Sequence, residues 1–140
     1  MRSKLFVPGS REELFAKAFA GEADAISFDL EDSVPEAAKA DARARVAAFL
    51  EGNARAGKVV VVRTNAVDSA HFEDDFRAVA LPAVDLLNLP KAEDAALLRE
   101  VGERLDALER SQGRHMPGLL VNIETPRGLR LAGQLAAAHP

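Results

Sequence analysis

The stretch Val59-Val60-Val61-Val62-Arg63-Thr64 contains four consecutive valines and is the clearest β-strand in the sequence. Similar short apolar runs lie on both sides of it, and longer Ala-rich amphipathic stretches separate these runs. We predict strands at Leu5–Pro8, Ala25–Asp29, Val59–Thr64, Asp85–Leu89 and Leu119–Ile123. Helices are expected from Ser10 to about Gly21, Pro35 to Leu50, Phe72 to Ala80, Glu93 to Gln112 and Leu129 to Ala138, with a capping box at Ser10-Arg11-Glu12-Glu13.

This alternation of strand and helix, repeated five times, predicts an α/β fold with a parallel sheet, either doubly wound or closed into a barrel. The sequence lacks the Gly-x-Gly-x-x-Gly fingerprint after the first strand, which counts against a dinucleotide-binding Rossmann unit. A complete (β/α)8 barrel takes about 250 residues. Five units in 140 residues would therefore be an incomplete barrel, and a plain Rossmann-like binding domain is the alternative.

The composition excludes several classes of protein. Apolar residues make up 48% of the chain and the formal net charge is -4, which suits a globular domain and not a nucleic-acid binder with a basic stripe. Because there is no cysteine, disulfides, thiolate metal sites and thiol catalysis are ruled out. No run approaches the ~18 apolar residues of a membrane span, and the N-terminus is a poor secretory signal. We expect a cytoplasmic protein without membrane or nucleic-acid partners.

Charged residues stand where three of the predicted strands end. Side chains alternate between the two faces of a strand, so the apolar positions should pack on the helices while Asp29, Arg63 and Glu124 share the opposite face. In barrels and open α/β sheets alike, the carboxyl edge of the strands is where active sites form. The sequence therefore predicts a site at this edge.

Each of these residues also has an ordinary structural interpretation. The three carboxylates of Asp29-Leu30-Glu31-Asp32 could simply favour the positive start of the next helix. Arg63 needs an anionic partner, supplied either by these carboxylates or by a substrate. Lys91 could be a helix-start lysine, and the three histidines are expected at the surface. Together, however, carboxylates from separate loops suit Mg²⁺, and an arginine fork suits a substrate carboxylate or an enolate oxygen.

Six motifs, in order from residue 2 to about residue 130, resemble the citrate lyase β-subunit (CitE-like) family of the HpcH/HpaI aldolase superfamily. They are Arg2-Ser3-x-Leu5-Phe6-Val7-Pro8-Gly9, Asp29-Leu30-Glu31-Asp32-Ser33-Val34-Pro35, Lys39-x3-Arg43, Val62-Arg63-x-Asn65, Leu89-Pro90-Lys91 and Ile123-Glu124-Thr125-Pro126.

The resemblance implies a (β/α)8 TIM barrel and Mg²⁺-dependent cleavage of a 3-hydroxy acyl thioester, such as citryl- or malyl-CoA. It implies that Glu124 is a metal ligand and acts in catalysis with Arg63, which would bind the substrate carboxylate and the oxygen that gains charge. Asp29, Glu31 and Asp32 would line the metal site through waters. Asp29, Glu124 and Lys91 would also contribute to substrate binding, and the Arg2/Lys4 end would meet coenzyme A phosphates.

The family's second metal-ligating aspartate follows a sixth strand, which this sequence does not contain. We therefore expect residues 1–140 to be the N-terminal part of a single TIM-barrel lyase domain, with the second direct ligand beyond Pro140. The alternatives are a 2-oxo acid aldolase, an acyl-CoA thioesterase, or a non-catalytic subunit for assembly or for binding an acyl carrier protein. By resemblance, a homo-oligomer is expected. The sequence does not name the acyl chain or distinguish coenzyme A from a carrier protein.

Overall fold

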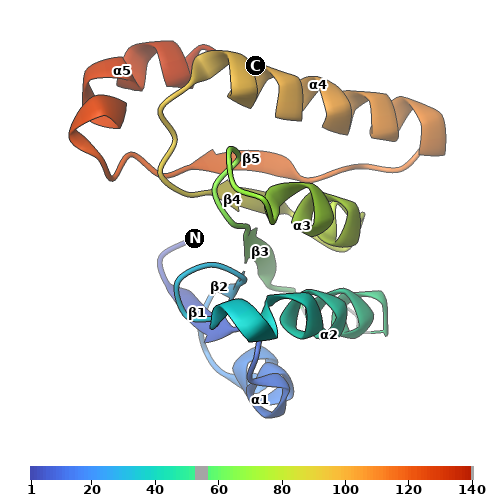
Figure 1. Cartoon of the computed structure of the whole chain (residues 1–140). Helices are drawn as coiled ribbons and strands as arrows, with labels where there is room; N and C mark the ends of the chain where they lie inside the picture. The colour runs from blue at the N-terminus through green and yellow to red at the C-terminus, as the bar shows by residue number, and fades with distance from the viewer. Residues whose placement is uncertain (53–56, 140) are drawn as a thin grey trace.

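The computed structural model describes residues 1–52 and 57–139, and within them the chain forms a five-stranded parallel sheet (Figure 1). The strand order is β1-β2-β3-β4-β5, so that each strand pairs with the next one in the sequence. This order is that of a barrel wall, whereas a doubly wound sheet reverses its order at a switch point. The α/β prediction is confirmed, and the sheet has the order of the first five units of a TIM barrel. The strands are β1 (Lys4–Pro8), β2 (Ala25–Asp29), β3 (Val59–Arg63), β4 (Leu86–Leu89) and β5 (Gly118–Val121).

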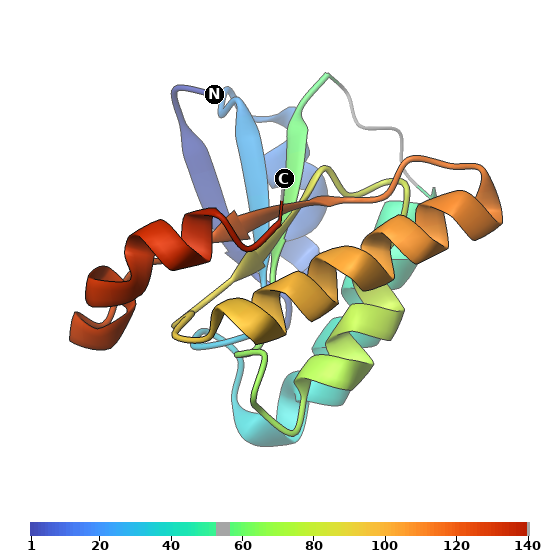
Figure 2. The same ribbon diagram turned by 90° about the horizontal axis from the view of Figure 1, so that it is seen from above.

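Helices follow the strands in the predicted alternation. In Figure 1 the first four of them succeed one another along the sheet in the order of the strands that precede them. The helices are α1 (Phe15–Ala20), α2 (Lys39–Gly52), α3 (Phe72–Val79), α4 (Ala95–Gln112) and α5 (Pro126–Ala136), with short 3₁₀ segments at Glu12–Leu14 and Glu36–Ala38 before α1 and α2. Seen from above, α5 lies apart from α2 and α3 (Figure 2).

Some boundaries differ from those predicted, each for a local reason. The capping box expected at Ser10 is wrong, because the first helical turn begins after Arg11 and has no side-chain cap. Helix α5 begins at Pro126 instead of Leu129, since the Thr125 hydroxyl accepts from the Gly128 N–H and Pro126 suits the first turn. Strand β5 ends at Val121, two residues earlier than expected.

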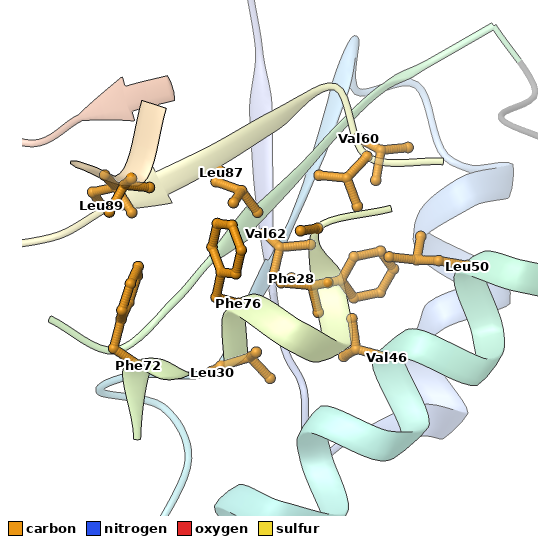
Figure 3. Packing of buried hydrophobic residues seen from close by; sticks show 14 of the residues in the cluster. Phe28, Leu30, Val46, Leu50, Val60, Val62, Phe72, Phe76, Leu87 and Leu89 are labelled. Atoms are coloured by element: carbon orange, nitrogen blue, oxygen red, sulfur yellow. The ribbon is translucent and has the colours of Figure 1, made fainter. Parts of the chain in front are cut away.

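The core lies between the sheet and its helices. Phe28 of β2, Val60 and Val62 of β3, and Leu87 and Leu89 of β4 all point into it (Figure 3). Phe28 also lies in a group of aromatic rings with Phe15, Phe19 and Phe49, and its ring centroid is 4.8 Å from that of Phe15. Alternate strand positions thus supply the helix-facing apolar surface, as the period-two pattern predicts.

The opposite face of the sheet carries the polar strand positions. Parallel register places Asp29 of β2 beside Arg63 of β3, and Arg63 beside Asn88 of β4. These residues lie at or near the carboxyl ends of their strands, so backbone pairing brings them together even though they are distant in sequence. Backbone pairing alone therefore places these residues at the carboxyl edge of the sheet, where the sequence predicts a site.

We predict that Phe28→Ala lowers the free energy of unfolding by about 3–5 kcal/mol, because it opens a cavity where the side chain is fully buried. The exposed Leu129, at 70% accessibility, offers a control whose replacement by Ala should change stability by less than about 0.5 kcal/mol. Urea denaturation of the three proteins measures both effects. Equal stability of the two variants would contradict the assignment of Phe28 to the core.

Candidate active site

The centre of the site is a two-bond ion pair between Arg63 and Asp29. Arg63 Nε donates to Asp29 Oδ1 and Nη2 donates to Oδ2, both at 2.7 Å. The Asp29 side chain is 2% exposed and that of Arg63 is 15% exposed, so both charges are largely removed from water. A guanidinium matched to a carboxylate in this parallel geometry has a fixed orientation as well as a neutralising partner.

Further hydrogen bonds hold the Asp29 carboxylate in its ionised form. Burial is the largest single influence and would raise its pKa, but the bonds from Arg63, from Ser33 and from the Glu31 N–H outweigh it. The net result is that the pKa of Asp29 lies below its ordinary value. The same pairing with Asp29 raises the pKa of Arg63. The two bonds that Asp29 accepts from Arg63 place it to orient the guanidinium.

Glu31 and Asp32 connect the ion pair to a second cation, Lys91. Arg63 Nη1 lies 3.1 Å from Glu31 Oε2 and 3.4 Å from Asp32 Oδ2. Lys91 Nζ lies 2.6 Å from Glu31 Oε1 and 3.2 Å from Asp32 Oδ1. The hydrogen bond with Glu31 raises the pKa of Lys91, despite the opposing effect of burial. The two acids of the loop after β2 therefore lie between cations from β3 and from the loop after β4.

Glu124 joins the same assembly through the backbone of Lys91. Its Oε1 accepts from the Lys91 N–H at 2.8 Å. The loops after β4 and β5 are held against each other nearby, because Thr125 donates to Glu93 and Gly128 lies against Ala92. A Cβ at Gly128 would come within 2.7 Å of the Ala92 carbonyl oxygen, so only glycine allows this approach.

The structure thus brings all six predicted site residues into one connected set. The sequence-predicted members are Asp29, Glu31, Asp32, Arg63, Lys91 and Glu124. The roles predicted for them in catalysis and in substrate or metal binding remain predictions.

A buried polar network behind these loops was not predicted from the sequence. Lys39 Nζ donates to the carbonyl oxygens of Leu30 and Glu31 and to Asn65 Oδ1. Asn65 donates through both its backbone N–H and its side-chain amide to Asp75 Oδ2, at 2.8 and 2.7 Å. The network ties the backbone that carries Glu31 to helices α2 and α3, so it helps to position the loop.

Asp75 is the fully buried member of that network, and Arg43 Nε donates to its Oδ1 at 2.9 Å. The motifs quoted above contain Lys39, Arg43 and Asn65, but the sequence did not predict that these residues contact one another through Asp75 and the acidic loop. The amphipathic pattern of α3 was the one available signal for Asp75, because this acid falls on the buried face of its helix beside Phe72, Phe76 and Val79.

Of the two N-terminal cations, Lys4 approaches Arg63, whereas Arg2 lies at the amino end of β2, beside Asp24. Lys4 Nζ is 4.5 Å from the centre of the Phe6 ring, and the Arg63 guanidinium is 5.4 Å from the same ring. Burial, followed by the charge of Arg63, lowers the pKa of Lys4. Arg2, in contrast, is 94% exposed and lies 3.9 Å from Asp24.

The three histidines lie in separate peripheral pairs. His71 pairs with Glu36, His115 with Glu109 and His139 with Asp106. The His115 side chain is 73% exposed, but those of His71 and His139 are only 29% and 21% exposed, so the expectation of surface histidines is met in full only by His115.

The donor chemistry of the site fits one part of a hard-cation centre. Glu124 is an exposed carboxylate that Lys91 links to Glu31 and Asp32, and carboxylate oxygens with bound waters are what Mg²⁺ accepts. Within residues 1–52 and 57–139, however, there is no group of three or more His, Cys, Asp or Glu arranged to hold a metal ion. Glu124 can thus supply one ligand, and the described residues do not form a complete metal site.

Comparison with known proteins places these residues in context. The model of the family "HpcH/HpaI aldolase/citrate lyase" matches residues 2–140. The chain is 36% identical over 139 residues to citrate lyase subunit beta of Escherichia coli K12, covering 98% of this chain and 46% of that protein. It is 37% identical over 143 residues to the L-malyl-CoA/beta-methylmalyl-CoA lyase of Cereibacter sphaeroides, covering 99% and 45%. The chain therefore spans about half the length of these relatives.

Solved structures agree with the sequence matches. The citrate lyase beta subunit of Mycobacterium tuberculosis, complexed with oxaloacetate and magnesium, matches with a TM-score of 0.74 at 36% identity, covering 96% of this chain and 52% of that one. CitE from the same organism, in complex with magnesium, acetoacetate and coenzyme A, matches with a TM-score of 0.75 at 37% identity, covering 98% and 45%. Among the residues described in this structure, none of the helices has the length and apolar character needed to span a membrane.

We predict that Asp29→Asn lowers the free energy of unfolding by about 3 kcal/mol at pH 7, because it leaves a largely buried guanidinium without its two-bond partner. Folding lowers the pKa of Asp29, so the pair stabilises the fold at pH values above the ordinary aspartate pKa of about 4. That contribution is lost as the pH falls through the lower folded value. The difference between native and variant proteins in urea denaturation should therefore shrink below about pH 4. Asp41→Asn, at an exposed position of α2, serves as the control, and a difference that stays constant with pH would contradict the prediction.

We predict that Asp75→Ala lowers the free energy of unfolding by about 3–5 kcal/mol, since Arg43 and the Asn65 N–H lose a buried partner. The neighbouring Asp74→Ala is a matched control, because Asp74 is 59% exposed and its pairs with Arg43 and Arg77 are long. Its effect should stay below about 1 kcal/mol in the same denaturation experiment. Similar losses in the two variants would show that Asp75 has no special structural role.

Proposed function

The chain belongs to the HpcH/HpaI aldolase/citrate lyase family, and we propose that it provides part of the active site of a Mg²⁺-dependent carbon–carbon lyase. The proposed substrate is a 3-hydroxy acyl thioester of the citryl- or malyl-CoA type, which cleaves to an oxo acid and an acyl thioester. Both relatives described above are lyases by name, and the structure matched at a TM-score of 0.75 holds magnesium and coenzyme A. Coenzyme A is therefore our choice over a carrier protein as the thioester group.

One observation carries the proposal, which is the orientation of Arg63. Asp29 holds its Nε and Nη2 at 2.7 Å, so that Nη1 faces Glu31 and Asp32 at the longer distances of 3.1 and 3.4 Å. A substrate carboxylate can compete for Nη1 without disturbing the Asp29 pair. The arginine would then present fixed positive charge without any need to reorganise when the substrate arrives.

The chemistry follows from where charge develops. Cleavage of the carbon–carbon bond leaves its electron pair on the thioester fragment as an enolate, while the hydroxyl group loses its proton and becomes the carbonyl of the oxo acid. The enolate carbon then takes up one proton to give the acyl thioester. Bound Mg²⁺ would supply Lewis acidity and a template for the oxygens of the oxo acid. Arg63 would hold the substrate carboxylate and stabilise the oxygen that gains charge, Glu124 would hold the cation, and Glu31 and Asp32 would bind its waters. Lys91 adds a second positive charge beside these acids.

We further propose that this chain is the N-terminal part of a longer barrel domain. Strands β1 and β5 are the edges of the described sheet, and an open edge is normally paired or covered. On the face of the sheet opposite the helices, Ser27 Oγ and both amide atoms of Asn88 are buried without a hydrogen-bond partner among the described residues. Buried polar groups are nearly always paired, so further strands and their side chains would complete this face.

In the proposed whole enzyme, Glu124→Gln and Arg63→Ala should each lower kcat/KM for citryl- or malyl-CoA cleavage by at least about 100-fold, because each removes a group that stabilises developing charge. The isolated 140-residue chain should bind Mg²⁺ poorly and show no turnover. Arg127→Ala, at an exposed position of α5, is the control and should keep native activity. The assay should identify the products, because an oxo acid with an acyl-CoA indicates a lyase whereas free coenzyme A indicates a thioesterase.

Robust turnover by the 140-residue chain would overturn the proposal that the site is divided in this way. Variants of Glu124 and Arg63 that keep activity within about threefold would argue against catalysis at this edge of the sheet, since a lost charge-stabilising donor costs far more.

A further inference from the structure

Lys91 has a backbone conformation that a residue with a side chain rarely adopts. Its φ is +50°, and among residues 1–52 and 57–139 it is the one non-glycine residue with positive φ. A lysine in the left-handed region is strained by its Cβ, and such strain persists only where surrounding contacts maintain it. Lys91 follows β4 by two residues, at the carboxyl edge of the sheet, so the strain lies within the site.

Two separate contacts hold this residue in place. Its backbone N–H donates to Glu124 Oε1 at 2.8 Å, toward the loop after β5. Its Nζ reaches the opposite way, to Glu31 Oε1 at 2.6 Å and Asp32 Oδ1 at 3.2 Å in the loop after β2. One residue thus joins the carboxylate proposed to hold the cation to the acids that surround Arg63.

Both contacts form at the observed φ of +50°. Rotation about the N–Cα bond sets the direction of the side chain relative to the N–H of the same residue. With the strand end held by the bond from the Asn122 N–H to the Leu89 carbonyl, a change of φ to the ordinary negative region would move the side chain relative to the N–H. To keep both the N–H on Glu124 and the ammonium on Glu31 at a negative φ, the side chain would have to adopt a different set of rotamers.

We propose that Lys91 is a positioning residue that aims the carboxylate of Glu124 at its cation through the backbone N–H, and that the Nζ ion pairs maintain the left-handed conformation this requires. The inference rests on the proposed function, because it takes Glu124 to be a metal ligand. It differs from a substrate-binding role, since the group that orients Glu124 is the peptide N–H. Bonds of this kind, from a neighbouring group to a metal ligand, typically change metal affinity by about 10–100-fold.

Two variants of the whole enzyme that lack the charge at position 91 separate the effect of the backbone conformation from the effect of the side-chain charge. Lys91→Gly removes the ammonium but leaves an N–H on a residue that adopts positive φ without strain. Lys91→Met removes the same charge, keeps the Cβ, and loses the ion pairs that hold the strained conformation. We expect Lys91→Gly to bind Mn²⁺, a spectroscopic probe for Mg²⁺, at least about 10-fold more tightly than Lys91→Met when binding is followed by electron paramagnetic resonance.

The removed positive charge changes cation affinity in both variants alike, so the difference between them reports the backbone alone. Lys91→Asn should fall between them, because asparagine tolerates the left-handed region better than methionine does. Lys91→Arg keeps a cation for Glu31 and Asp32 and should keep Mn²⁺ affinity close to that of the native enzyme. The Asn and Arg variants keep the test decisive if Lys91→Met folds poorly.

Equal Mn²⁺ affinities of the Gly, Asn and Met variants would overturn the proposal, as would tighter binding by Lys91→Met than by Lys91→Gly. Differences confined to urea denaturation midpoints, without a change in Mn²⁺ affinity, would also overturn it by showing a purely structural role. Failure of the proposed function would have another signature, because Glu124→Gln would then leave Mn²⁺ binding to the otherwise native enzyme unchanged.

Discussion

The ion pair between Arg63 and Asp29 is the constraint on which the rest of the site depends. A guanidinium with a side chain only 15% exposed needs a carboxylate close by, because the cost of removing an unpaired charge from water exceeds the contribution of most single interactions. Register between β2 and β3 supplies that carboxylate directly, by placing the two residues opposite each other in adjacent strands. The pair is thus positioned by backbone hydrogen bonding and not by a flexible loop, which fixes the direction of the remaining N–H groups.

From that pair, charge alternates outward across the carboxyl edge of the sheet. Acids of the loop after β2 lie between Arg63 and Lys91, and Lys91 in turn reaches Glu124 through its peptide N–H. Lys39 and Asn65 bind the backbone of the same acidic loop and connect it to the buried Asp75. The loop is consequently held from both sides, by ion pairs at its side chains and by hydrogen bonds at its carbonyl groups. Such preorganisation is what electrostatic catalysis by a lyase of this family would require.

Much of this architecture was readable from local patterns. Four valines in a row, and apolar runs like them, predicted the strands because β-branched residues favour extended backbone, and the intervening amphipathic stretches predicted the helices. The period of two assigned Asp29 and Arg63 to the face away from the helices. Helix starts were harder, because a cap depends on the path of the chain before it: Ser10 had the expected pattern but does not cap, whereas Thr125 does.

The sequence by itself determined the order of the elements, the two faces of each strand and the charged residues at the strand ends, since all of these follow from spacing along one segment. Only the tertiary structure decided which charges meet. The register joining Asp29 to Arg63, the bonds from Arg43 and Asn65 to Asp75 and the left-handed turn at Lys91 each depend on groups from separate segments of the chain. Contacts of this kind are set by how strands and helices pack in three dimensions, so they cannot be predicted from the spacing of residues within any one segment.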